Sequence, residues 1–208
     1  MRILNRIGII AIPITFFLAG NGMLLLLRVE TARLPFIEQI TFYETEWFVS
    51  HIILLLSTMC ILPAALSLQS VINHSRPKIL GTIMVIIIAP TSILLAGQYA
   101  IDFVVPLMVR VGGDALKVHG LLSTTSLIDI LFYGLPNLVF LALMLLTIAV
   151  VWSKVLTRLP AILLIFNWLM VMLGNLVHPG FQRVAILFLA LSYLPLVKKM
   201  WRYNGNVV

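Results

Sequence analysis

Charged side chains, and acidic ones above all, are scarce in this sequence. Charged residues make up 10% of the 208 residues and hydrophobic residues make up 62%. A soluble domain typically has roughly 25% charged and about 45–50% apolar residues. A water-soluble fold of this composition would have too little polar surface to cover itself. We therefore expect the chain to fold in a membrane, where lipid replaces water around its apolar side chains.

Cysteine is nearly absent as well. The single cysteine, Cys60, cannot form a disulfide within the chain, so cysteine usage does not identify the compartment. Cys60 lies inside an apolar run, and apolar surroundings disfavour the thiolate that performs cysteine chemistry. The sequence therefore favours a packing role for Cys60 over a reactive one.

Several motifs of well-known chemistry are missing. The sequence contains no HExxH, CxxC or HxH pattern, so no dedicated metal site is expected. It also lacks a P-loop and a GxSxG motif, which argues against ATP-driven work and against a serine hydrolase of the usual type. The formal net charge is +7, but the basic residues flank apolar runs and do not gather on one patch. Nucleic acid is therefore not an expected partner.

Long apolar runs are what the sequence does contain. A helix needs about 20 mostly apolar residues to cross a bilayer, and six segments meet this requirement. They predict an all-α fold, a polytopic membrane bundle of six transmembrane helices forming a single transmembrane domain over residues 1–208. The first run is longer than an ordinary signal-peptide core, so we interpret it as a true helix. The short apolar stretch Phe103–Val109 is expected to extend the third helix or to lie in the interface. The predicted spans are 7–27, 47–68, 79–101, 127–152, 160–177 and 184–200.

Lysine and arginine are unevenly distributed between the two sides of the predicted bundle. With the N-terminus in the cytoplasm, the inner segments hold nine of the fourteen basic residues and no acidic residue, a net charge of +9. The outer segments have a net charge of −2. Because cytoplasmic segments carry an excess of Lys and Arg, both termini are predicted to be cytoplasmic, in a multi-pass protein of the inner (plasma) membrane. The seven acids, all predicted outside, are Glu30, Glu38, Glu44, Glu46, Asp102, Asp114 and Asp129.

Two long links, Arg28–Glu46 and Asp102–Ser126, also lie on the predicted outer side. Long links without structure of their own are uncommon unless they are functional. Any function carried by loops is therefore expected outside the cytoplasm. Tyr43, Trp47 and Tyr99 fall at the same boundary, which is where membrane proteins concentrate Trp and Tyr.

Polar residues recur at helical spacing in the outer halves of the predicted helices. In the second span, Ser50 and His51 are followed seven residues later by Ser57 and Thr58, which places all four on one face. Polar side chains facing hydrocarbon are expensive, so we expect them to turn inward and meet in a polar cavity open to the outside. The residues predicted to bind a ligand there are Glu46, His51, Gln98, Asp102, Asp129, Tyr133, Asn137, Asn175 and His178.

Each of these residues also has a structural interpretation. Ser, Thr and Asn can simply hydrogen-bond neighbouring helices, at about 0.6 kcal/mol each. His51 is either a metal ligand, haem ligand or proton carrier, or a plain interfacial residue. His178 either caps the fifth helix before Pro179 or faces His51 across the cavity. Asp129 either complements the start of its helix or joins Asp102 in binding a cation or relaying protons.

One stretch of the second span carries a resemblance to known proteins. It consists of the sequence His51-Ile-Ile-Leu-Leu-Leu followed by Leu62-Pro63-Ala64-Ala65-Leu66. This His-led helix with an apolar Pro-Ala end resembles uncharacterised families of bacterial six-helix integral membrane proteins of similar length. The resemblance implies the six-helix layout, and it implies neither a reaction nor a functional residue.

Three functional hypotheses follow from these patterns. The first is an outward-facing site for a small polar, cationic or amphiphilic ligand, serving transport, sensing or delivery, with negative charge from Glu46, Asp102 and Asp129. His51 and His178 would supply its proton-tunable groups. The second is a membrane enzyme acting on lipid or quinone, with a His and an Asp as acid and base. The third is a non-catalytic partner subunit bound to another membrane protein. The lipid bilayer is a partner in all three, and the cofactor, the ligand and the question of catalysis stay open.

Overall fold

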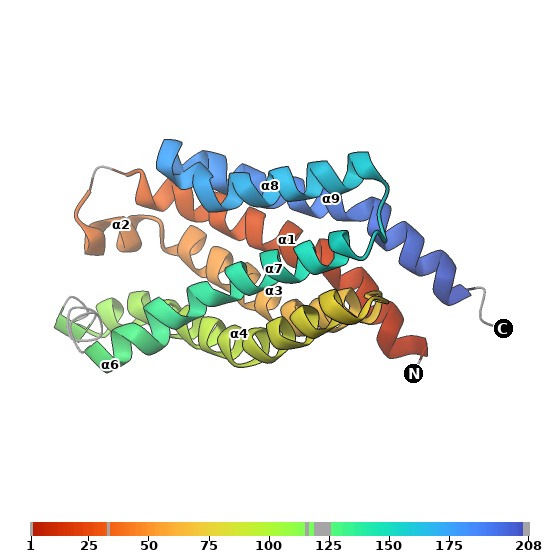
Figure 1. Ribbon diagram of the computed structural model, residues 1–208. Coiled ribbons are helices and arrows are strands. Elements are labelled where there is room, and N and C mark those ends of the chain that lie inside the picture. Colours follow the sequence, from red (N-terminus) through yellow and green to blue (C-terminus); the bar gives the residue numbers. More distant parts are fainter. Residues whose placement is uncertain (1, 33, 115–116, 119–125, 206–208) are drawn as a thin grey trace.

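The computed structural model describes residues 2–32, 34–114, 117–118 and 126–205, and this part of the chain consists of helices and short links without a strand (Figure 1). Six helical spans are long and apolar enough to cross a membrane, as the sequence predicted. Five are continuous helices, and the fourth is built from several pieces. The continuous helices are α1 (Arg2–Glu30), α3 (Glu44–Ser70), α4 (Ser75–Arg110), α8 (Arg158–Val177) and α9 (Pro179–Gly205).

The helices extend beyond the apolar runs that predicted them, because polar flanking residues continue the helical backbone. The clearest case is α4, which runs through Phe103–Val109 to Arg110 and so confirms that this stretch extends the third span. The long link after α1 contains a helix that the sequence did not predict, α2 (Phe36–Phe42). Its Ile40 is fully buried in a small apolar cluster with Val29, Trp47 and Val105, which holds α2 against the bundle.

Proline interrupts the fourth span. This span begins with α6 (Ser126–Asp129), passes through a π-helical turn at Ile130–Gly134 and a 3-10 turn at Leu135–Asn137, and continues as α7 (Leu138–Trp152). Pro136 has no N–H to donate and its ring displaces the carbonyl one turn earlier, so regular α-helix cannot pass through it unchanged. The Asn137 amide donates to the Tyr133 carbonyl oxygen at 2.8 Å, which satisfies an acceptor in the irregular region.

The six spans pack in a defined order. Helix α1 lies between α3 and α9, α9 also packs on α8, and α3 packs on α4, which in turn packs on α7 (Figure 1). The contact between α1 and α3 is close at Gly8, where a Cβ atom would lie 2.7 Å from the Pro63 carbonyl oxygen. It is close again at Gly22, where a Cβ atom would lie 2.8 Å from the Leu54 side chain. Small residues let membrane helices approach in this way, since lipid gives little hydrophobic drive between them.

A polar cluster lies in the middle of the apolar core. The side chains of Thr147, Trp168 and Tyr193, from α7, α8 and α9, are all fully buried. The Trp168 indole donates to both hydroxyls at 3.1 Å, and the two hydroxyls hydrogen-bond each other. Phe16 of α1 stacks on Tyr193, with ring centroids 5.1 Å apart, and meets Trp168 edge to face. The cluster therefore joins four helices while leaving none of its own polar groups unbonded.

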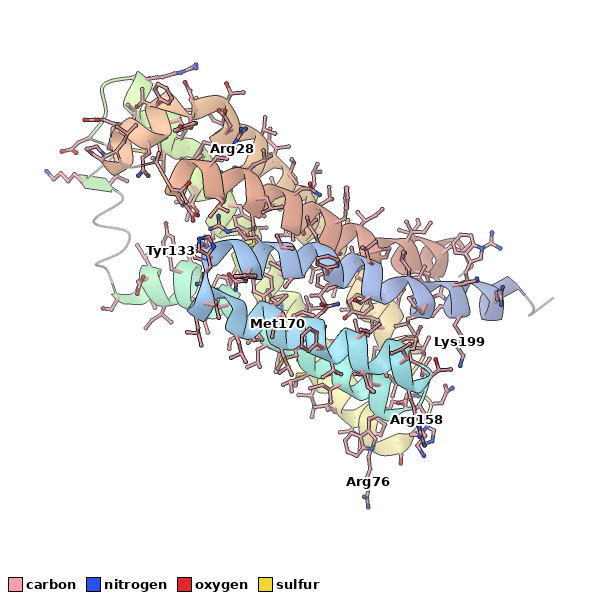
Figure 2. All side chains as sticks on the ribbon, turned by 90° about the horizontal axis from the view of Figure 1, so that it is seen from above. Arg28, Arg76, Tyr133, Arg158, Met170 and Lys199 are labelled. Atoms are coloured by element: carbon pink, nitrogen blue, oxygen red, sulfur yellow. The ribbon has the colours of Figure 1, made fainter. Side chains whose placement is uncertain are left out.

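The charges divide the bundle into two ends. We call the end that carries the acidic residues the acidic end, and the end with Arg76, Lys78, Lys154, Arg158, Lys198, Lys199 and Arg202 the basic end. Figure 2 shows Arg28 and Tyr133 near the acidic end, opposite Arg76, Arg158 and Lys199. The first turns of α1 and the last turns of α9 lie at the basic end (Figure 1).

Candidate functional site

Two ionisable side chains meet between α3 and α4 at the acidic end. The Nε2 atom of His51 lies 4.0 Å from Oδ2 of Asp102. The His51 side chain is 3% exposed and the Asp102 side chain is 16% exposed. Ionisable residues within membrane spans are expensive to keep and are functional by default. This pair is therefore the centre of the candidate site.

Trp47 fixes the position of both residues. Its indole Nε1 donates to the backbone carbonyl oxygen of Asp102 at 2.8 Å, which ties α3 to α4. Its own carbonyl oxygen lies 2.7 Å from Nδ1 of His51, one helical turn further along α3. The Trp47 and His51 rings also pack against each other, with centroids 4.5 Å apart. Trp47 therefore positions both the His51 imidazole and the part of α4 that carries Asp102.

The hydrogen bond to Trp47 decides which nitrogen of His51 is available. A carbonyl oxygen can only accept, so Nδ1 carries the hydrogen and Nε2 is left facing the Asp102 carboxyl group. A neutral imidazole in this tautomer presents a lone pair to Asp102. The two groups then attract each other only when a proton resides on one of them. At 4.0 Å the two atoms are beyond hydrogen-bond distance, so one proton bound to either group would balance the charge of the pair without being shared.

Aromatic residues surround the pair. The Tyr133 hydroxyl, from the irregular part of the fourth span, donates to Oδ1 of Asp102 at 3.4 Å. The Tyr99 ring lies edge to face with His51 at 6.3 Å between centroids. We call Trp47, His51, Tyr99, Asp102 and Tyr133 together the His51–Asp102 site. Three of these five residues are aromatic, and Asp102 carries the one carboxyl group among them.

Asp102 differs from the other paired carboxylates in having no fixed cation beside it. Glu44 accepts from Arg110 at 2.8–2.9 Å, and Glu30 accepts from Arg183. Within the described residues, Asp102 contacts His51 and Tyr133 and pairs with no Lys or Arg. Its negative charge is therefore compensated inside the protein only when a proton is present on the pair.

The structure brings three of the nine predicted ligand-binding residues together, His51, Asp102 and Tyr133. Gln98 and Glu46 are half-buried on the same two helices, Gln98 one turn before Asp102 and Glu46 directly before Trp47. Neither forms a hydrogen bond or an ion pair with another side chain in the described part of the chain. These two residues flank the site without contacting its carboxyl group.

The remaining four predicted residues are exposed. Asp129 lies in α6, and Asn137 bonds to its own helix through the Tyr133 carbonyl. Asn175 is exposed near the end of α8. His178 ends α8, its Nδ1 accepts from the Gly180 backbone N–H at 3.0 Å, and its ring packs on Phe181. The structure thus gives His178 the capping position that was one of its two interpretations.

Sequence reasoning assigned Trp47 and Tyr99 only to the interfacial belt and missed their contacts with the pair. The available signal was their spacing. Trp47 precedes His51 by four residues and Tyr99 precedes Asp102 by three, which puts each aromatic residue on the same face as its ionisable neighbour. The hydrogen bond from the Trp47 indole to another helix had no sequence signal.

The described residues contain no group of three or more His, Cys, Asp or Glu side chains placed to hold a metal ion. Comparison of the chain with protein families, with curated proteins and with solved structures finds no match. The functional argument therefore depends on the residues of the His51–Asp102 site themselves.

Proposed function

We propose that this multi-pass membrane protein binds a small organic or amphiphilic cation at the His51–Asp102 site, in exchange for the proton held by the pair. The binding would serve the uptake, sensing or delivery of that cation. We place the protein in the plasma membrane with its acidic end outside, in accord with the distribution of Lys and Arg. The cation would then be taken from the extracytoplasmic side.

The observation that carries the proposal is the uncompensated carboxyl group of Asp102. A buried charge without a partner is strongly unfavourable, so this group requires a positive charge or a proton. Glu30 and Glu44 each receive a positive charge from an arginine, whereas no described Lys or Arg pairs with the Asp102 carboxyl group, whose described polar partners are His51 and Tyr133. A cation that reaches Asp102 supplies the missing charge and makes the proton unnecessary.

The aromatic residues around Asp102 suit the same kind of ligand. Cations are attracted to the faces of Trp and Tyr rings, by about 0.5–2 kcal/mol depending on desolvation. Trp47, Tyr99 and Tyr133 supply three such rings. The Asp102 side chain is 16% exposed, so a ligand can reach its carboxyl group. Aromatic rings close to a single carboxylate favour organic cations over strongly hydrated metal ions.

The proposal is tested by measuring binding of tetraphenylphosphonium and choline to the purified protein in neutral detergent, together with proton release in weak buffer. Loss of a charged partner typically costs about 1.5–3 kcal/mol, so Asp102→Asn is expected to weaken binding by roughly ten- to a hundredfold. Binding to the unaltered protein should strengthen as pH rises, because protons and the cation compete for the same carboxylate.

Asp129→Asn is the matched control, since it removes an exposed carboxylate from the same end of the molecule. It should leave both affinities almost unchanged and should release the same number of protons as the unaltered protein. Equal binding by the Asp102→Asn variant and the unaltered protein would refute the proposed role of this site.

A further inference from the structure

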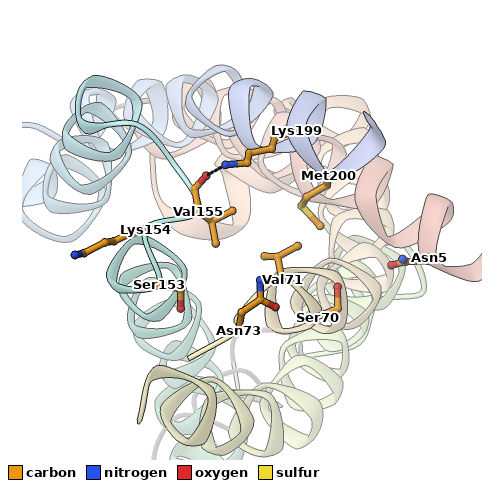
Figure 3. Close-up of a pocket in the computed structure, with 9 residues that line it drawn as sticks. All are labelled: Asn5, Ser70, Val71, Asn73, Ser153, Lys154, Val155, Lys199 and Met200. Carbon is orange, nitrogen blue, oxygen red and sulfur yellow. Dashed lines mark hydrogen bonds between the residues drawn. The ribbon is translucent and has the colours of Figure 1, made fainter. Parts of the chain in front are cut away.

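The basic end contains a cavity that the proposed function does not use. Its volume is about 320 Å³, at the lower end of the range of about 300–1,000 Å³ typical of small-molecule sites. It lies where the first turns of α1, the ends of α3 and α7 with their following links, and the last turns of α9 come together (Figure 3). Four elements far apart in the sequence thus contribute to one pocket.

Hydrogen-bond donors from separate elements line this cavity. The ammonium group of Lys199 reaches over it and donates one hydrogen to the Val155 carbonyl oxygen at 2.7 Å (Figure 3). An ammonium group has three hydrogens, so two remain for a ligand. The exposed amide of Asn73 lines the opposite side and forms no hydrogen bond with the described residues. Lys154 follows the end of α7 and extends outward at the rim.

The charge around the cavity has one sign. All the described charged residues at this end are Lys or Arg, and the described carboxylates lie at the other end of the bundle. The carbonyl ends of α3 and α7 oppose this with about half a negative charge each. Lys199 donates to the carbonyl oxygen of Val155, in the link that follows α7, and so brings a positive charge close to the end of that helix. The surroundings therefore favour an anion.

Apolar side chains also line the cavity. Val71, Val155 and Met200 line it alongside the polar groups. A ligand that satisfies both kinds of surface carries an anionic head that accepts hydrogen bonds and an apolar portion next to it. Basic pockets between membrane helices on the positively charged side bind phosphate-bearing head groups by this combination.

We propose that this cavity binds a phosphate group, either that of an anionic membrane lipid or that of a soluble phosphate compound. Lys199 and Asn73 donate to the phosphate oxygens, Lys154 adds charge at the rim, and Val71, Val155 and Met200 contact the apolar portion. The site is independent of the His51–Asp102 site, which lies at the opposite end of the bundle.

The test is native mass spectrometry of the full-length protein in neutral detergent, titrated with phosphatidylglycerol and with diacylglycerol, which lacks the phosphate. About 0.15 M ammonium acetate screens attraction beyond about 8 Å, so that only local contacts count. Phosphatidylglycerol is expected to bind at least tenfold more tightly than diacylglycerol. Competition by inorganic phosphate and by glycerol 3-phosphate separates the two sources: displacement at millimolar concentration assigns the site to soluble phosphates, and retention of the lipid assigns it to the membrane.

Two substitutions locate the binding. Lys199→Gln and Asn73→Ala are each expected to weaken binding of the phosphate-bearing ligand, by about tenfold and about fivefold respectively. Lys198→Gln is the matched control, because it removes the same charge from the adjacent exposed residue that does not line the cavity. Equal losses in the Lys198 and Lys199 variants would overturn the proposal. If Lys199→Gln does not fold, the Asn73→Ala variant provides the test. Unchanged binding of the phosphate-bearing ligand in that variant would also overturn the proposal.

Discussion

The hydroxyl group of Tyr193 shows how a polar atom is kept in the apolar centre of this bundle. It accepts from the Trp168 indole and is hydrogen-bonded to the Thr147 hydroxyl, while its ring stacks on Phe16. Each polar atom of the cluster thus has a partner on another helix. Such bonds are worth only about 0.6 kcal/mol on average in membrane proteins, but an unbonded group in the same place costs more.

Tyr193→Phe is expected to lower the free energy of unfolding by about 1 kcal/mol, because it leaves the Trp168 indole and the Thr147 hydroxyl with one partner fewer while keeping the ring. Reversible unfolding in mixed detergent micelles measures this difference. Tyr43→Phe is the control, since the Tyr43 hydroxyl has no hydrogen bond within the described residues and its removal should change stability little. A Tyr193 variant as stable as that control would show that the cluster only fills space.

The sequence contained one usable sign of this cluster. Tryptophan in membrane proteins concentrates at the interfaces, and its N–H seeks a partner when it is buried. Trp168 lies in the middle of its span, so its indole needed a polar partner from another helix. Its two partners are 21 and 25 residues away along the chain, with no spacing pattern to connect them. Which residues they are could therefore not be predicted.

Two ion pairs connect helices at the acidic end, and each has a more buried and a more exposed member. Arg183 of α9 is 8% exposed and pairs with Glu30 of α1, which is 51% exposed. In the second pair the carboxylate is the buried member, with Glu44 of α3 at 21% and Arg110 of α4 at 65%. Removing the exposed member leaves a buried charge alone, whereas removing the buried member leaves a hydrated one.

Glu30→Gln is therefore expected to destabilise the protein by about 2 kcal/mol, and by more than Arg183→Gln does. The order should reverse in the second pair, with Arg110→Gln more damaging than Glu44→Gln. Unfolding of the four single variants in mixed micelles measures both differences. Equal effects of the two substitutions within each pair would mean that burial does not determine their cost.

At the scale of elements, the apolar composition predicted most of the fold. Runs of about 20 apolar residues located all six spans, because such long apolar runs are typical of membrane-spanning helices and of few other structures. Helix α2 was not predicted because seven residues are too few to show a periodic pattern. Its stability comes from the packing of Ile40 on Trp47. The irregular turns at Ile130–Asn137 were not predicted either, although Pro136 marks their position.

The candidate site was predicted only in part, because helical spacing gives limited information about contacts between helices. Helical spacing identifies which residues share a face, and so it selected His51, Asp102 and Tyr133 correctly as neighbours. Spacing does not say which faces meet. Asn175 and His178 were included because they lie at the same depth, but α8 packs on α9, away from the contact between α3 and α4. Depth alone therefore overestimated the size of the cluster.

At the scale of the whole molecule, the separation of charge between the two ends predicts the orientation in the membrane. We expect Glu38→Cys to react with a membrane-impermeant maleimide in intact cells, and Arg158→Cys to react only after the membrane is opened. Both side chains are exposed at opposite ends of the bundle. The single native cysteine, half-buried in the span of α3, is first replaced by alanine. The reverse labelling pattern would invert the orientation.

The helices also differ in how much bilayer they can cross. Helix α8 has 20 residues, about 30 Å at 1.5 Å per residue, which equals the hydrocarbon thickness of a typical bilayer. The other five spans have between 24 and 36 residues and can tilt to adjust. A thicker bilayer would therefore draw the polar ends of α8, Arg158 and His178, into hydrocarbon before it affected any other span. One short helix thus sets the upper limit of membrane thickness in which this bundle fits without distortion.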